Sequence, residues 1–370
     1  MDSIFRNLSS LIFMIMTLLL LTTSVIAAEK DDEDGEEEEN ELAETYQNPF
    51  EEISENNITE FSDFLSIRTT LEFEKEKIEQ NFFGNLNKKP LVPSTRLLEL
   101  EIEIDLPQNY SFNITLQDET QGKIATSGTD EYELKLELNG FEITAGRFDL
   151  PFTEFHSYFI SDTLVEFAEP NSEAVMFSYE NDNLQTALIL LQSKVTSISN
   201  ESKYDYAYNI NFLSDDQRFM IGFGFLSDLA ESDEQFLEDF NNQYKNRISA
   251  VTTQIFYAWQ NLEIYGEMVR ADDAFFELDK TSNRPVASNF EIAWYPRYDL
   301  QIALRYETSE ELEDAPKRQK GIAIAWRPLN QIELAVELLQ ADFRKNFVLD
   351  NNDIALETSE QIVGQFTFEF

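Results

Sequence analysis

The chain has 370 residues, of which 71 are Asp or Glu and 27 are Lys or Arg, and its formal charge at pH 7 is −44. Such a surface repels phosphate groups, which argues against a nucleic-acid-binding protein. Cysteine is absent, and this excludes disulfide bonds, thiol chemistry and a lipid anchor on cysteine.

Residues 1–28 have the layout of a secretory signal peptide. Arg6 supplies a positive charge, Leu11 to Leu21 form an apolar run, and Ala27 and Ala28 are small residues suited to cleavage. The apolar run is shorter than the roughly 20 residues that a transmembrane helix needs. A signal peptide is therefore expected, with a retained anchor as the alternative.

Residues 29–61 are strongly acidic. The run from Glu36 to Glu39 has nothing to bury, so we expect a disordered periplasmic segment that serves as a spacer or binds cations or a basic partner. A single structural domain, residues 62–370, is expected to follow.

Alternation with a period of two dominates the rest of the chain. Residues 98–106 alternate apolar and acidic side chains without a break, and on a helix this pattern would scatter charge over every face. Asn139-Gly140 lies between two alternating runs, which is a strong hairpin signal. Sixteen strands are predicted, near residues 65–75, 97–106, 110–118, 131–138, 141–149, 173–181, 184–193, 203–213, 217–226, 248–258, 262–271, 288–296, 299–307, 320–328, 331–341 and 360–370.

The predicted connections alternate in length. Each even-numbered strand is followed by a short turn, and each odd-numbered strand by a longer, usually polar loop. Strands of about 9–11 residues with this layout are typical of an all-β transmembrane antiparallel barrel of the bacterial outer membrane, with periplasmic turns and extracellular loops. Trp259, Trp294 and Trp326 all end even-numbered strands, so we expect them at the periplasmic interface.

The last strand places three aromatic residues, Phe366, Phe368 and Phe370, on one face and polar residues on the other. In water this face would aggregate, whereas in a bilayer it would contact lipid. A terminal Phe370 also looks like the signal by which the barrel-assembly machinery recognises outer-membrane barrels. Membrane lipid and lipopolysaccharide are the other expected partners.

An enzyme is not expected. His156 is the only histidine, and no spacing identifies a nucleophile or an orienting group for it. No cofactor motif occurs. The acidic loop at Glu310, Glu311, Glu313 and Asp314 could hold a divalent cation or simply be solvated.

The barrel lumen is the better place to look for function. If Leu98 and Leu100 face lipid, the acidic residues between and after them face inward, and rows of one charge sign set the ion preference of a channel. The same alternation predicts lumen-lining positions at Arg68, Glu99, Glu101, Glu103, Asp105, Glu133, Glu137, Glu263, Glu267, Arg305, Arg327, Glu333 and Glu337.

The third long loop, residues 150–172, is unusually aromatic. Such a loop either packs on the rim of the barrel or folds into the lumen and narrows it. We expect the inward fold. Arg147, Asp149, Glu154 and Asp162 are then the candidates for the constriction and for ligand contact.

The same region carries a resemblance to a known family. Residues 146–152 read Gly-Arg-Phe-Asp-Leu-Pro-Phe, and Phe155, Ser157-Tyr158 and Ile160-Ser161-Asp162 follow. This resembles the signature of the LbtU-type siderophore porins, from which the chain departs at Thr153 and Thr163, where the family has Gly and Pro. The resemblance implies a plugless outer-membrane barrel that takes up an iron–siderophore complex.

Two other functions fit the same barrel. One is a general or ion-selective diffusion porin, for which the acidic lumen favours cations over anions. The other is a structural or adhesive barrel with no role in transport.

Overall fold

The structure is a computed structural model, and it describes residues 59–62, 65–83, 86–87, 91–106, 109–121, 124–138, 140–194, 196–197, 204–232, 243–278, 283–312, 315–344 and 355–370. All of these residues belong to one compact unit, residues 44–370. The expected signal peptide and most of the acidic segment lie outside the described residues.

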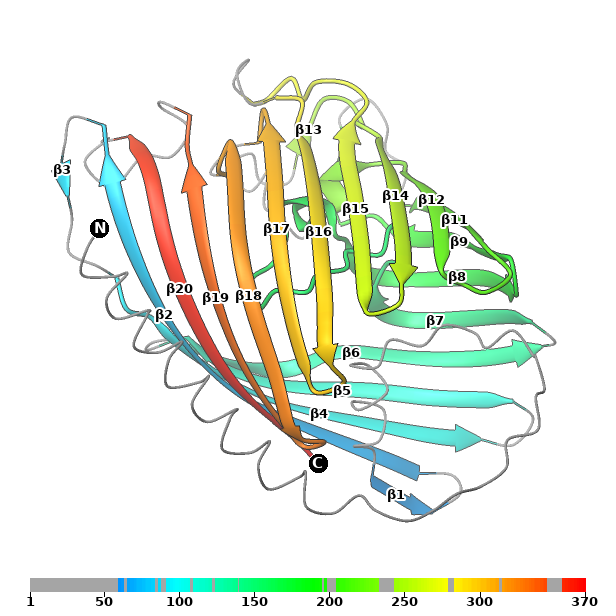
Figure 1. The fold of residues 1–370 in the computed structure, drawn as a ribbon. Helices are drawn as coiled ribbons and strands as arrows, with labels where there is room; N and C mark the ends of the chain where they lie inside the picture. The colour runs from blue at the N-terminus through cyan, green and yellow to red at the C-terminus, as the bar shows by residue number, and fades with distance from the viewer. Residues whose placement is uncertain are drawn as a thin grey trace, which may run out of the picture. The chain divides into compact units, whose positions relative to one another are not determined.

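Sixteen strands form a closed antiparallel β-barrel (Figure 1). In chain order they are β2 (Leu65–Phe82), β4 (Ser94–Leu106), β5 (Tyr110–Gln121), β6 (Ile124–Leu138), β7 (Phe141–Asp149), β8 (Asn171–Asn181), β9 (Leu184–Gln192), β11 (Tyr204–Leu213), β12 (Phe219–Leu226), β14 (Ala250–Trp259), β15 (Leu262–Ala271), β16 (Val286–Arg297), β17 (Leu300–Glu310), β18 (Arg318–Leu329), β19 (Ile332–Asp342) and β20 (Leu356–Glu369).

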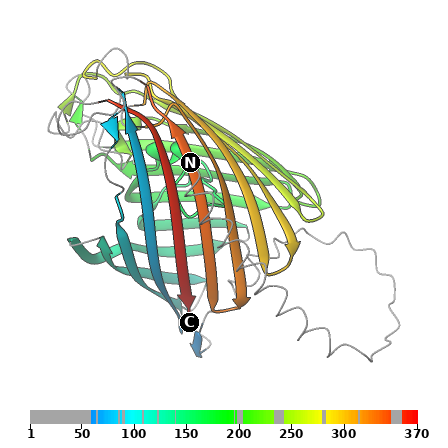
Figure 2. The same ribbon diagram turned by 60° about the vertical axis from the view of Figure 1, so that its left-hand side comes forward.

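Each barrel strand pairs with its neighbour in the sequence, and β20 closes the ring by pairing with β2 from Thr70–Glu369 to Phe82–Leu356. Figure 2 shows β20 between β2 and β19. The predicted fold class is confirmed, and the structure contains all sixteen predicted strands. Many of them extend a few residues beyond the predicted ends, because strand pairing continues past the stretch in which the alternation is regular.

Several short strands and helices lie outside the sixteen barrel strands. Strands β1 (Thr59–Ser62) and β3 (Leu86–Asn87) pair with β2, and β10 (Thr196–Ser197) pairs with β13 (Gln243–Tyr244). Two 3₁₀ helices, η1 (Leu164–Ala168) and η2 (Leu229–Glu231), lie in connections. None of the described helices has the length and apolar character needed to cross a membrane.

Two boundaries differ from the sequence-based expectation. Residues 59–61, expected to end the disordered segment, belong to β1, whose pairing with β2 orders them. The loop expected between residues 118 and 131 is largely strand, since β5 and β6 continue to Gln121 and Ile124. Polar side chains there weaken the alternation, but a hairpin needs only backbone pairing to continue.

The connections define two rims. One, here called the short-turn rim, carries connections of five residues or fewer, including Asn139-Gly140, where Gly140 adopts a φ of 82°. The opposite, long-loop rim carries most of the longer connections. Trp259 ends β14 beside a short turn, and Trp294 and Trp326 lie three residues before the ends of β16 and β18, so all three lie toward the short-turn rim, as the sequence predicted.

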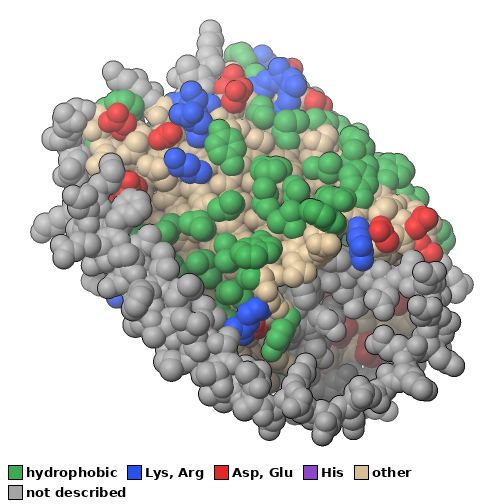
Figure 3. Space-filling view, in the orientation of Figure 1, with side chains coloured by type: hydrophobic (Ala, Val, Ile, Leu, Met, Phe, Trp, Pro, Cys, Tyr) green, Lys and Arg blue, Asp and Glu red, His purple; other side chains and the backbone are tan. Residues whose placement is uncertain are grey.

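The outer surface of the barrel is apolar. Side chains of one parity point outward and are strongly exposed (Figure 3), among them Leu98, Phe177, Leu190, Phe223 and Leu304. On β20 the outward set includes Phe366, whose ring lies 6.4 Å from that of Phe73, while Val363 and Thr367 are buried on the inner side. A belt of this kind suits contact with lipid, and an inner face of alternating polar residues suits a lumen.

This assignment of faces predicts the effect of a new charge. Replacing Ile102, which lies on the outer face between Ile67 and Ile114, with Arg should destabilise the barrel in a bilayer by about 2–4 kcal/mol, the cost of a basic side chain at mid-depth on a lipid-facing strand. Thr115→Arg is the matched control, because Thr115 lies on the inner face opposite Glu101 and should tolerate the charge. Urea unfolding in lipid vesicles measures both, and equal costs would mean that the assigned faces are wrong.

Candidate functional site

The connection between β7 and β8, residues 150–170, crosses the interior of the barrel, and we call it the lumen loop. The backbone N–H of Tyr158 donates to Glu291 on β16 at 2.7 Å, and that of Leu164 donates to Glu307 on β17 at 2.6 Å. Residues 164–168 form η1, which contacts β15, β16 and β17. Figure 1 shows this segment behind the same strands. The loop starts on one wall of the lumen and is attached to the opposite wall.

The first and last parts of the lumen loop are held by apolar packing. Leu150, Phe152 and Val165 are at most 1% exposed and join a cluster with side chains from β8, β9 and β12 and from the loops of the long-loop rim. Gly224 on β12 permits the closest approach, because a Cβ there would lie 1.8 Å from the carbonyl oxygen of Phe152. This cluster fills one side of the interior and explains why the aromatic loop leaves water.

Carboxylates on the inner wall hold the middle of the loop. Glu337 on β19 accepts hydrogen bonds from the backbone N–H groups of Ile160 and Ser161, at 2.9 and 3.1 Å, and from the Ser161 hydroxyl. The hydroxyl group of Thr153 likewise donates a hydrogen bond to the carboxylate of Glu267 on β15. A carboxylate that accepts backbone N–H groups satisfies donors that would otherwise be buried without partners.

Arg305 on β17 connects the loop to this acidic wall. Its side chain is fully buried, its Nε lies 2.8 Å from Glu291, and its Nη1 donates to the carbonyl oxygens of Ser161 and Asp162 at 2.8 and 3.1 Å. The guanidinium also lies over the ring of Phe159, 4.3 Å from its centroid. Arg305 therefore compensates buried carboxylates and is not available to a passing solute.

Two titratable side chains of the lumen loop are also buried. Glu154 accepts hydrogen bonds from Asn211 and Gln254. Burial raises the pKa of Glu154, and the two hydrogen bonds lower it in part. Burial lowers the pKa of His156, although Glu291 and Glu263 partly oppose this, and its ring packs against Tyr158 and Tyr265. His156 is therefore neutral at pH 7 and adds no positive charge to the loop.

The wall opposite the loop's anchors is acidic. On the inner faces of β2 and β4–β7 only two basic side chains are described, and each is paired: Arg68 with Glu101 at 3.3 Å, and Lys135 with Glu133 at 2.7 Å. We call this surface the acidic wall. Its carboxylates are Glu72, Glu74, Glu76, Glu99, Glu101, Glu103, Asp105, Glu119, Glu131, Glu133, Glu137 and Glu142.

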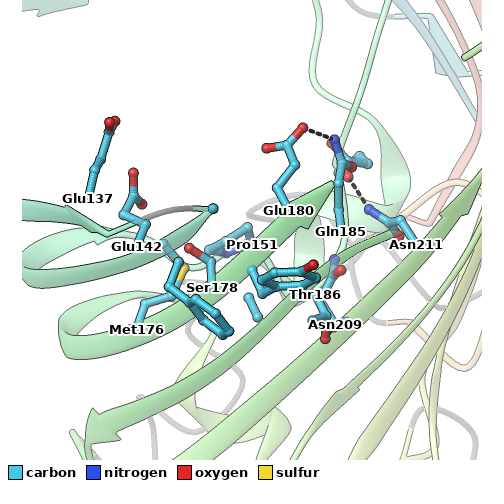
Figure 4. A pocket seen from close by; sticks show the side chains of 15 residues that line it. Glu137, Glu142, Pro151, Met176, Ser178, Glu180, Gln185, Thr186, Asn209 and Asn211 are labelled. Atoms are coloured by element: carbon cyan, nitrogen blue, oxygen red, sulfur yellow. Dashed lines mark hydrogen bonds between the residues drawn. The ribbon is translucent and has the colours of Figure 1, made fainter. Parts of the chain in front are cut away.

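The acidic wall leads to a cavity beside the start of the lumen loop (Figure 4). The cavity measures about 320 Å³ and is bounded by four carboxylates and several amides. Glu180 accepts from Gln185 at 2.9 Å, and Glu154 accepts from Asn211 at 2.8 Å. No basic side chain lines this cavity among the described residues.

Two of the four predicted constriction residues do not face the lumen. Arg147 and Asp149 share the outer face of β7 with Phe141, because the buried, inward-facing residue between them is Phe148. Asn171 joins the two, accepting from the Arg147 guanidinium at 2.8 Å and donating to Asp149 at 2.7 Å. Their assignment to the constriction is corrected: they close the strand pair β7–β8 at the long-loop rim.

The other two constriction candidates lie on the lumen loop itself, Glu154 in the pocket of amides and Asp162 beside Arg305. The predicted lining residues fall into three groups. Arg68, Glu99, Glu101, Glu103, Asp105, Glu133 and Glu137 belong to the acidic wall, whereas Glu263, Glu267, Arg305 and Glu337 are covered by the lumen loop, and Arg327 pairs with Glu333 at 2.7 Å.

Sequence reasoning missed Glu72, Glu74, Glu291 and Glu307. The first two follow Arg68 at the same parity on β2 and could have been found by extending the alternation. Glu291 and Glu307 alternate with apolar residues in the same way, but their role depends on the loop that contacts them.

No protein-family model and no curated protein sequence matches the chain. Solved structures do match. The outer membrane channel DcaP of Acinetobacter baumannii has a TM-score of 0.57 at 12% identity, covering 83% of this chain and 97% of that one. The anion-selective porin from Comamonas acidovorans gives 0.61 at 9% identity, covering 83% and 99%. Salmonella typhi OmpF, in complex with daunomycin, gives 0.57 at 12% identity, covering 84% and 99%.

The chain has the porin fold. Because these identities are low, the likeness establishes the closed 16-stranded barrel and leaves its selectivity to be argued from this chain's own residues.

Proposed function

We propose that the protein is a porin of the bacterial outer membrane whose pore prefers cations. The acidic wall carries this proposal: twelve of its described carboxylates lie on the inner face, and the two described basic side chains among them are both paired. A lumen lined by one sign of charge raises the local concentration of counter-ions and repels ions of like charge.

Outer-membrane barrels have short periplasmic turns and longer extracellular loops. The short-turn rim of this barrel would therefore face the periplasm, and the long-loop rim would face outside. Phe370 is then the terminal residue read by the barrel-assembly machinery. Its backbone N–H and C=O pair with Thr69 of β2, at 3.0 and 2.8 Å, so the last residue takes part in closing the barrel. Lipid and lipopolysaccharide surround the apolar outer face.

Uptake of an iron–siderophore complex is the finer hypothesis, and it rests on the resemblance of residues 146–162 to the siderophore porins. The geometry narrows the ligand that such a role would allow. With Arg147 outside the lumen, the described basic side chains that an anionic chelate would meet on the acidic wall are Arg68 and Lys135, and both are engaged with carboxylates. Arg327, across the lumen, is likewise paired with Glu333. A neutral or cationic complex fits the acidic wall better.

Ion selectivity tests the channel proposal. In planar bilayers under a KCl gradient, the reversal potential should have the sign of cation preference. Replacing Glu99, Glu101 and Glu103 by Gln should move this potential clearly toward zero, because three charges leave one stretch of the lumen. The control is Asp149→Asn with Glu173→Gln, which removes charges from the outer face of the strand pair β7–β8 and should leave the potential unchanged.

Two outcomes would contradict the proposal. A silent, correctly folded barrel would favour the structural or adhesive alternative. Anion preference in the unaltered protein would exclude the acidic wall as the selectivity element. Growth of a deletion strain under iron restriction tests the siderophore hypothesis separately: unchanged growth with several siderophores would leave a general cation-preferring porin.

A further inference from the structure

The cavity beside the start of the lumen loop, here called the side cavity, is built on one continuous row of inner-face residues. Across β6, β7, β8, β9 and β11 the cross-strand pairs of this row join Glu137, Glu142, Ser178, Ala187 and Asn209. The volume of the cavity, about 320 Å³, lies within the range of about 300–1,000 Å³ that small-molecule sites occupy. The side cavity is therefore large enough to hold a small organic solute.

Asn209, at one end of the row, is a buried amide without a partner. The residue is 6% exposed and lines the side cavity (Figure 4). Within the described residues, no hydrogen bond reaches its side-chain amide. The amides of the next row are in use, since Gln185 donates to Glu180 and Asn211 donates to Glu154. Buried amides nearly always have hydrogen-bond partners, so Asn209 points to a ligand in the cavity.

The other end of the row is negative. Glu137 and Glu142 lie directly opposite each other on β6 and β7, and like charges in this position repel. Among the described residues, the donors that reach Glu154 and Glu180 are neutral amides, and no basic side chain lines the cavity. A ligand with an ammonium group would reduce the repulsion and would bring three N–H donors to these carboxylates.

The arrangement fits an organic cation better than a metal ion. The ligands of a metal ion converge on one point, and in the described part of the chain the carboxylates of the side cavity do not converge in this way. Met176, Pro151 and Ala187 add apolar surface to the lining, and the carbon chain of a solute can pack against it.

We propose that the side cavity binds a small organic cation with an ammonium group at one end and a neutral hydrogen-bonding group, such as an amide, at the other. The ammonium group binds at the carboxylates, and the neutral group bonds to Asn209. This inference rests on the proposed function and names a class of solute for the cation-preferring pore. Gly140 of a short turn also lines the cavity, so the site lies toward the short-turn rim, past the lumen loop for a solute that enters from the long-loop rim.

Saturation-transfer NMR on the full folded chain in detergent tests the site without requiring conduction. The probe is 4-aminobutanamide, and pentylammonium is the matched probe that keeps the cation but lacks the amide. Both should bind, with pentylammonium about three- to tenfold weaker, since a single hydrogen bond contributes about 0.5–1.5 kcal/mol. Asn209→Leu should weaken only 4-aminobutanamide and so remove this difference. Glu142→Gln combined with Glu180→Gln should weaken both probes at least about tenfold, because two of the four carboxylates lose their charge.

Asn113→Leu is the matched control. Asn113 is an inner-face amide on β5 that donates to Glu133 and does not line the side cavity, so its loss should leave both affinities unchanged. Heat modifiability in gel electrophoresis checks that each variant is folded.

Two results would overturn the inference. One is the absence of saturation transfer to either probe in the unaltered folded chain. The other is an affinity for 4-aminobutanamide that Asn209→Leu leaves unchanged, because the ligand would then not contact this amide. The proposed function fails separately: a barrel that binds the probe but shows no cation preference in bilayers contradicts that function alone, and a cation-preferring channel that does not bind the probe contradicts this inference alone.

Discussion

Deleting residues 154–163 from the lumen loop is expected to raise single-channel conductance by about two- to threefold, because a 16-stranded barrel leaves a wide aqueous channel unless a loop occupies it. The deleted segment spans the loop's attachments to Glu291 and Glu337, on the wall opposite the strand from which the loop starts. Without it, the path along the acidic wall would widen toward β16–β19.

Planar-bilayer recordings measure this effect, and a variant in which residues 154–163 are replaced by ten Gly and Ser residues is the matched control. This control keeps the chain length but removes the side chains that bond to the wall. It should give an intermediate, noisier conductance. If both variants conduct like the unaltered protein, the segment does not limit the flow of ions.

Replacing Arg305 by Ala is expected to cost about 3–5 kcal/mol of stability, the range measured when one partner of a buried ion pair is removed. Glu291, 2.8 Å from the Arg305 guanidinium, would lose its buried counter-charge, and Glu307, at 3.8 Å, would lose part of its own. The carbonyl groups of Ser161 and Asp162 would lose their donors. The lumen loop should loosen at the same time, so conductance should rise and fluctuate.

Arg318→Ala provides the comparison. Arg318 lies on the neighbouring strand β18 and pairs with Asp342 at 3.3 Å, but both side chains are about half exposed. Surface pairs of this kind contribute about 0–1 kcal/mol. Urea unfolding followed by tryptophan fluorescence measures both variants. An Arg305→Ala cost no larger than that of Arg318→Ala would show that the buried network does not stabilise the barrel.

The predicted constriction is only partly correct, because two of its four residues lie on the outer face of β7. Arg147 and Asp149 are next to the aromatic lumen loop in the sequence, but a strand turns successive side chains to opposite faces, and Phe148 takes the inward position. The hydrophobic parity of β7 fixes this, since Phe141 is the most exposed residue at its start. The alternation along β7 therefore places Arg147 and Asp149 on the outer face, even though both are close to the loop in the sequence.

The function of the inner carboxylates could not be predicted in the same way. Glu103 and Glu337 show the same pattern in the sequence, one acidic residue between apolar neighbours. Glu103 lies on the acidic wall and accepts from Ser66 at 3.3 Å, whereas Glu337 is buried under the lumen loop. Which wall the loop covers depends on packing between residues more than a hundred positions apart, and no local pattern records that.

The sequence by itself determined the sixteen strands, their order, the alternation of short and long connections and the apolar outer face. These follow from local periodicity, because a strand that separates lipid from a polar lumen must alternate at every second residue. Only the tertiary structure decided which carboxylates remain in the lumen and which ones anchor the loop. Those outcomes depend on contacts between distant strands, where burial and charge compensation act on residues that the sequence keeps far apart.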